Sequence, residues 1–112
     1  VPLGVLKQGT ITFSPKLPHR KIQSITNLGM GTLDKVYLRY NEVFWDEDVT
    51  WIATPENDLP AGQFNQWLNL YRYVGEPVIL AFNGAQPALV LAHLSDVEIV
   101  YLAHQTLIGA YS

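Results

Sequence analysis

The hydrophobic pattern of this chain changes its period at residues 29–31, and this change constrains the fold more than any other feature of the sequence. Ahead of it, Ile22, Ile25 and Leu28 recur at helical spacing. Proline suits the first turn of a helix, where its missing N–H costs nothing, and glycine suits a left-handed stop. The sequence therefore predicts a helix over residues 18–28, beginning at Pro18 and stopped by glycine at position 29.

Beyond the glycines the period falls to two, as in a strand with one buried face. One set of alternate residues is apolar or aromatic, and the other set contains charges. The first set is Val36, Leu38 and Tyr40, and the second is Lys35, Tyr37 and Arg39.

Three later segments have the composition of strands. Residues 50–54 are β-branched and aromatic, residues 64–73 are rich in aromatic side chains, and residues 78–82 are continuously apolar. Clusters of proline, glycine, asparagine and aspartate separate them, and these residues form turns. An antiparallel meander with residues 78–82 at its centre is the simplest arrangement.

Two more helices are expected after the last strand. The helical period returns over residues 85–92, and Ser95 with Glu98 three positions later forms a capping box for a final helix. This order indicates an α+β fold, with a mainly antiparallel sheet of four to five strands and helices covering one face. Residues 9–13 are the candidate fifth strand, and residues 1–112 are expected to form a single domain.

The uncovered face of the sheet is expected to be aromatic. Such a face suits either the wall of a cavity or contact with a neighbouring domain. The residues assigned to it are Leu33, Lys35, Tyr37, Trp67, Tyr71 and Tyr73.

Charge and composition argue against several classes of protein. The 7 Lys and Arg residues are scattered and the net charge is -3, so no nucleic-acid surface is expected. The absence of cysteine excludes disulfides and favours a cytoplasmic location. The longest apolar run, residues 77–82, is too short to span a membrane. Because His19, His93 and His104 lie far apart in the sequence, no metal site is predicted.

The first part of the chain carries an ordered set of motifs. VPLGVLK occupies residues 1–7, LPHRK residues 17–21 and GMGTLDKVYLRY residues 29–40, and the pair Phe44-Trp45 follows. This order closely resembles a stretch of the flavin-dependent amine oxidases, which include polyamine oxidases, monoamine oxidases and lysine-specific histone demethylases. In that family the stretch links the flavin-binding domain to the substrate-binding domain.

The resemblance implies a catalytic role for Lys35. GMGTLDKVYLRY is similar to the family's Gly-x-Gly-x-Leu-Asn-Lys-Val pattern, in which the lysine holds a water against flavin N5. A cation there would stabilise negative charge on the reduced flavin and on reduced oxygen. Taken alone, a lysine in an alternating strand is more often solvated than catalytic, and the resemblance reverses that preference. Met30 and Asp34 depart from the family's usual phenylalanine and asparagine.

Three more positions are candidate site residues on the same resemblance. Pro2 and Leu3 match the residues at which the family's chain leaves the flavin domain, which implies contact with the cofactor. A simple strand exit is an equal interpretation of this pair. Leu33 shares a strand face with Lys35 and is the candidate substrate contact, with core packing as the alternative.

The sequence lacks the family's glycine-rich dinucleotide-binding fingerprint. It therefore resembles the substrate-binding domain of a larger FAD-dependent amine oxidase, and the missing FAD-binding domain is its expected partner. The implied reaction is hydride transfer from an amine substrate to flavin, with O2 as the final acceptor. Alone, the fragment is expected to be inactive, to hold no FAD and to self-associate. The competing hypothesis is a non-catalytic α+β module that binds a peptide or a protein.

Overall fold

The computed structural model describes residues 1–55 and 58–112, and the chain forms two compact units. The first unit is Val1–Gly31 and the second is Thr32–Ser112. The sequence pattern had suggested a single domain over the same residues. Within the described residues, no helix combines the length and apolar character that crossing a membrane requires.

Two short helices form the first unit, α1 (Leu3–Gln8) and α2 (His19–Asn27). α2 agrees with the predicted helix to within one residue at each end, and Pro18 is its N-cap. The predicted left-handed stop at Gly29 is wrong. The helix ends on an extended Leu28, and a left-handed φ of 75° occurs at Gly31.

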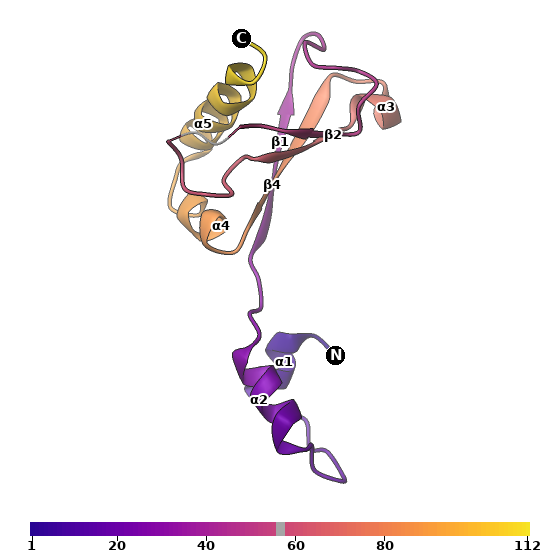
Figure 1. Cartoon of the computed structure of the whole chain (residues 1–112), viewed down its shortest axis with the longest axis vertical. Coiled ribbons are helices and arrows are strands. Elements are labelled where there is room, and N and C mark those ends of the chain that lie inside the picture. The colour runs from indigo at the N-terminus through magenta and orange to yellow at the C-terminus, as the bar shows by residue number, and fades with distance from the viewer. Residues whose placement is uncertain (56–57) are drawn as a thin grey trace. The chain divides into compact units, whose positions relative to one another are not determined.

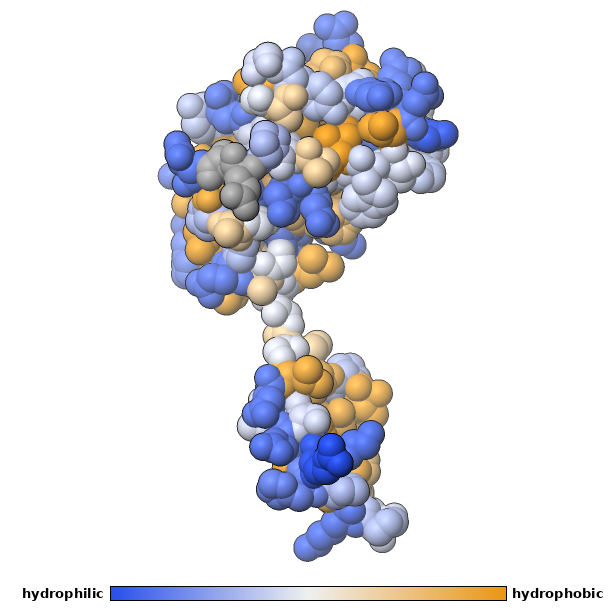
Figure 2. Space-filling model, in the orientation of Figure 1, coloured by the Kyte–Doolittle hydropathy of each residue, from blue (hydrophilic) through white to orange (hydrophobic). Residues whose placement is uncertain are grey.

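The sequence did not predict α1. Pro2 provides its N-cap and Gly9 closes it in the left-handed region, so the opening motif is helical and not a strand exit. Residues 9–13 lie in no strand, which leaves the sheet with four strands and makes the fifth-strand prediction wrong. An open apolar cleft of about 420 Å³ lies in this unit, and Figure 2 shows apolar side chains on its surface. The apolar lining residues are Leu6, Ile11, Phe13, Leu17, Ile22 and Ile25.

The second unit contains a four-stranded antiparallel sheet (Figure 1), which confirms the α+β class. A simple meander is wrong for the first strand, because the strand order is β1-β4-β3-β2. β4 lies at the centre, between β1 and β3, as its continuous apolar run predicted, and most of its residues are buried. The strands are β1 (Leu33–Arg39), β2 (Trp51–Ala53), β3 (Gln66–Asn69) and β4 (Val78–Gly84).

Three helices belong to the second unit: α3 (Tyr71–Val74), α4 (Gln86–Leu91) and α5 (Asp96–Gly109). In Figure 1, α4 and α5 lie to the left of the sheet and α3 to its right. The predicted capping box of α5 is confirmed, because Ser95 accepts from the Glu98 backbone N–H and the Glu98 carboxylate accepts from the Ser95 N–H at 2.8 Å.

The core lies between one face of the sheet, the inner face, and the helices. Cross-strand partners share a face, so Val36, Ala81, Trp67 and Ile52 form one row across the four strands. Trp67 and Ala81 are completely buried in this row. Helices α4 and α5 cover it with Leu91, Ala103 and Leu107, which belong to the same cluster of buried residues.

Candidate functional site

The opposite side of the sheet, here called the open face, carries exposed apolar and aromatic side chains. Strand register places the residues of this face in two rows that each cross all four strands, and among them only Leu80 is buried. The first row is Lys35, Phe82, Gln66 and Ala53, and the second is Tyr37, Leu80, Leu68 and Trp51.

Lys35 lies in the middle of β1 on the open face, as the alternation predicted. Leu33 and Tyr37 flank it on the same face, 62% and 60% exposed. Its ammonium nitrogen lies 5.9 Å from the centroid of the Phe82 ring, its direct cross-strand partner. The structure therefore brings the two predicted residues, Leu33 and Lys35, together on one uncovered surface.

Phe82 and Trp51 form the aromatic part of this surface. Their ring centroids are 5.5 Å apart with an interplanar angle of 40°. Phe82 is half-buried and the indole of Trp51 is 57% exposed. The sequence analysis missed both residues; residues 78–82 are continuously apolar, so no alternation distinguishes the two faces of β4.

The charge of Lys35 is not neutralised by any carboxylate among the described residues. Arg39, four positions further along the same face, pairs with Glu76 at 2.6 Å. No ion pair of this kind involves Lys35 in the part of the chain that the structure describes. Its ammonium therefore keeps its N–H donors available for water or an external acceptor.

Three aromatic residues assigned to the open face are elsewhere. Trp67 is completely buried on the inner face, where its register with Ala81 and Ile52 places it. Tyr71 and Tyr73 belong to α3, because the predicted strand over residues 64–73 ends at Asn69. That part of the prediction is wrong.

An aromatic cluster closes the end of the second unit where β1 ends. The Tyr40 hydroxyl and His104 Nδ1 of α5 share a hydrogen bond at 3.0 Å. Tyr40 also contacts Phe44 and Trp45 edge to face, at 4.9 and 5.7 Å between centroids. Burial raises the pKa of Tyr40 to about 12. These contacts anchor α5 to β1, away from Lys35, so the cluster is structural.

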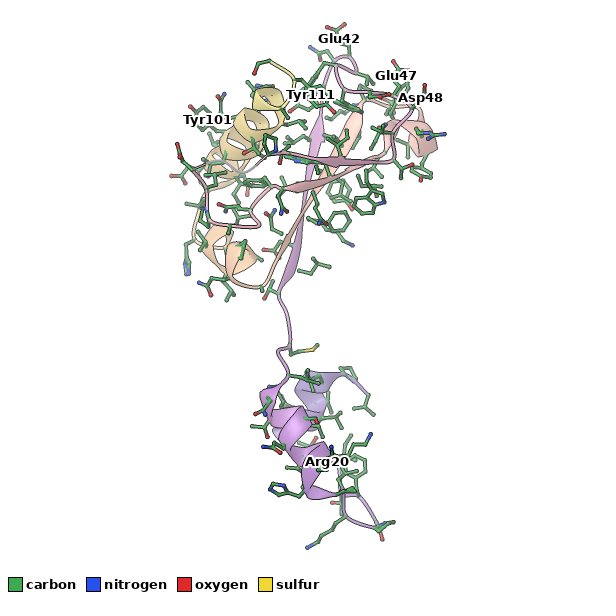
Figure 3. All side chains as sticks on the ribbon, viewed as in Figure 1. Arg20, Glu42, Glu47, Asp48, Tyr101 and Tyr111 are labelled. Atoms are coloured by element: carbon green, nitrogen blue, oxygen red, sulfur yellow. The ribbon has the colours of Figure 1, made fainter. Side chains whose placement is uncertain are left out.

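The acidic residues after this cluster do not form a metal centre. Asp46 Oδ1 accepts from the backbone N–H of Asp48 at 3.0 Å, as in a solvated turn. Figure 3 shows Glu47 and Asp48 side by side at the surface. No cluster of His, Cys, Asp or Glu within the described ranges has the arrangement that a metal ion needs.

Pro2 and Leu3 lie in the first unit, at the start of α1. Pro2 is exposed and caps the helix, and Leu3 is half-buried in its first turn. Both positions are therefore surface positions of a small helical unit. Their contact with a cofactor stays a prediction.

Comparison with known proteins identifies the family of this chain. The profile of the flavin containing amine oxidoreductases matches residues 1–111, almost the whole chain. The chain therefore belongs to the flavin containing amine oxidoreductase family.

Plant enzymes are among its most similar relatives. Lysine-specific histone demethylase 1 homolog 3 of Arabidopsis thaliana is 42% identical over 88% of this chain. Polyamine oxidase 5 of Oryza sativa subsp. japonica is 41% identical over 89%, and polyamine oxidase 2 of Arabidopsis thaliana is 38% identical over 86%. These matches cover only 6%, 20% and 19% of the relatives' own lengths. The chain thus corresponds to a small part of each relative.

Proposed function

We propose that this chain is the substrate-binding part of an FAD-dependent amine oxidase, and that its open face faces the flavin and the amine. The observation that carries the proposal is the position of Lys35. It is an exposed ammonium with no carboxylate partner among the described residues, in the middle of an apolar and aromatic surface. Membership of the flavin containing amine oxidoreductase family supports the same assignment.

The residues present fit a flavin. A planar, largely apolar ring is compatible with this sheet surface, and the open face offers the exposed side chains of Leu33 and Tyr37 on either side of the Lys35 ammonium. When bound, FAD would supply the acceptor for hydride and the later reaction with oxygen. The chain's own residues would exclude water from the amine and orient it.

Lys35 has a separate task in this proposal. Its ammonium would donate to a water and would stabilise negative charge that develops during the oxygen half-reaction. Hydride transfer leaves a neutral amine nitrogen as a cationic imine, so a nearby cation gives that step no comparable help. Lys35 is therefore expected to act mainly after the amine has been oxidised.

Stopped-flow kinetics of Lys35→Met in the full-length protein that contains this chain test the assignment. We expect flavin reoxidation to slow by on the order of 100-fold and flavin reduction to change by less than about threefold. Lys21→Met, an exposed lysine of α2, is the matched control and should leave both rates unchanged. Equal rates in Lys35→Met and wild-type protein would remove the basis of the proposal.

A non-catalytic interaction module is not proposed. Its main support was the absence of a catalytic cluster in the sequence, and the match to an enzyme family over residues 1–111 accounts for the chain without it.

A further inference from the structure

We propose that Phe82, supported by Trp51, is a positioning residue for the ammonium of Lys35. This inference rests on the proposed function of Lys35 and adds the groups that hold its side chain in place. All of these residues belong to the second unit.

Strand register sets Lys35 beside Phe82. Lys35 and Phe82 are direct partners in the antiparallel pair of β1 and β4. Side chains that face each other across such a pair start from Cβ atoms only about 5 Å apart. The ring of Phe82 is therefore within reach of the lysine side chain without any rearrangement of the backbone, and Nζ lies 5.9 Å from its centroid.

An aromatic ring and a carboxylate hold an ammonium in different ways. The face of an aromatic ring attracts a cation through its quadrupole, and 5.9 Å is within the range of that attraction. A carboxylate would also hold the ammonium, but it would neutralise the charge and occupy its N–H donors. Phe82 restrains Lys35 and leaves both its charge and its donors for the reaction.

The orientation of the Phe82 ring depends on its contact with Trp51. Phe82 is only half-buried, so packing in the core does not fix its orientation. Trp51 contacts it with centroids 5.5 Å apart, approaching from β2. In the sheet order β1-β4-β3-β2, Lys35 and Trp51 lie on opposite sides of β4. The ring is therefore bounded by the indole on one side and by the ammonium on the other.

The test is a double-mutant cycle in the full-length, flavin-loaded protein, read as the rate of flavin reoxidation. Phe82→Leu should slow reoxidation about two- to fivefold, the effect of losing one exposed cation–π contact. Phe82→Tyr keeps the ring and should keep the wild-type rate. In a Lys35→Met background, Phe82→Leu should have no further effect, because Phe82 acts only through the ammonium. Tyr73→Leu removes an exposed ring from α3 and is the matched control.

A second readout does not depend on activity. Crystal structures of the wild-type and Phe82→Leu proteins should show Nζ of Lys35 ordered over the ring in the first and displaced or disordered in the second. An unmoved Nζ would overturn the inference, and so would an equal loss of rate from Phe82→Leu with Lys35 or Met at position 35. If Lys35→Met itself reoxidises at the wild-type rate, the proposed function fails, and the crystallographic comparison still decides whether Phe82 positions the lysine.

Discussion

Asn69 holds several segments of the second unit together from a completely buried position. Its Oδ1 accepts hydrogen bonds from Trp45 Nε1 at 3.0 Å and from the backbone N–H of Tyr71 at 3.1 Å. Its Nδ2 donates to the carbonyl oxygens of Glu47 and Val49 at 3.1 and 2.9 Å. One side-chain amide therefore fixes the loop between β1 and β2 against the end of β3.

Removing this amide should loosen the loop. Asn69→Ala removes the partner of an indole N–H, a backbone N–H and two carbonyl oxygens, which costs about 3 kcal/mol of local stability. We expect amide exchange in residues 46–49 to accelerate by on the order of 100-fold, measured by mass spectrometry of the full-length protein. Asn65→Ala removes an exposed amide four positions earlier and is the control. Equal exchange in the two variants would contradict this role of Asn69.

A sequence pattern predicts the position of some single residues correctly and of others wrongly. Lys35 and Leu33 were assigned to one face correctly, because the alternation of residues 35–40 fixes the parity of the strand, and the burial of β1 follows the same period. Trp67 was assigned to the wrong face. An aromatic run carries no parity of its own, and only its pairing with Ala81 directs Trp67 inward. A fully buried Asn83 in the central strand was equally outside any apolar pattern; its Oδ1 accepts from the backbone N–H of Phe64 at 2.8 Å.

Among the helices, α5 has the most complete start signal, and that signal depends on pH. The Ser95 hydroxyl, and then the Ser95 backbone N–H, donate to the Glu98 carboxylate and lower the pKa of Glu98 below its ordinary value of 4.5. A carboxyl whose pKa is lowered by folding stabilises the protein above the unfolded pKa. This contribution is lost as the pH falls through the lowered, folded value.

The corresponding prediction compares wild-type protein with Glu98→Gln. The amide of glutamine still accepts a hydrogen bond but does not titrate, so the wild-type advantage in melting temperature should be present at about pH 6 and should shrink as the pH falls below 4.5. Thermal unfolding followed by circular dichroism measures it. A constant difference across this range would show that the carboxylate contributes nothing through its ionisation.

Elements with local signals were predicted, and elements defined by distant partners were not. The capping box fixed the start of α5, and alternation fixed β1. In contrast, α1 and α3 are short helices of 6 and 4 residues, for which the helical period has too little length to appear. The pairing of β1 with β4 joins residues far apart in the sequence, and no local pattern encodes it.

At the scale of the whole molecule, the open face raises the question of what covers it. Leu33, Tyr37 and Trp51 are all more than half exposed there. Contiguous apolar surface of this kind usually meets a partner or a ligand. In the proposed function that partner is the FAD-binding part of the enzyme, so the chain expressed alone has this surface uncovered.

The 112-residue chain expressed alone should therefore self-associate through the open face, because burying its aromatic side chains against a second copy removes them from water. Light scattering should show an average mass that rises with concentration. Trp51→Lys adds a charge to the open face and should shift the chain toward monomer. Tyr73→Lys makes the same kind of change at an equally exposed aromatic residue of α3 and should not. Two outcomes would show that the chain does not self-associate through the open face: a wild-type chain that stays monomeric at every concentration, or an equal response to both substitutions. Either outcome would count against the assignment of the open face as the side that meets the flavin.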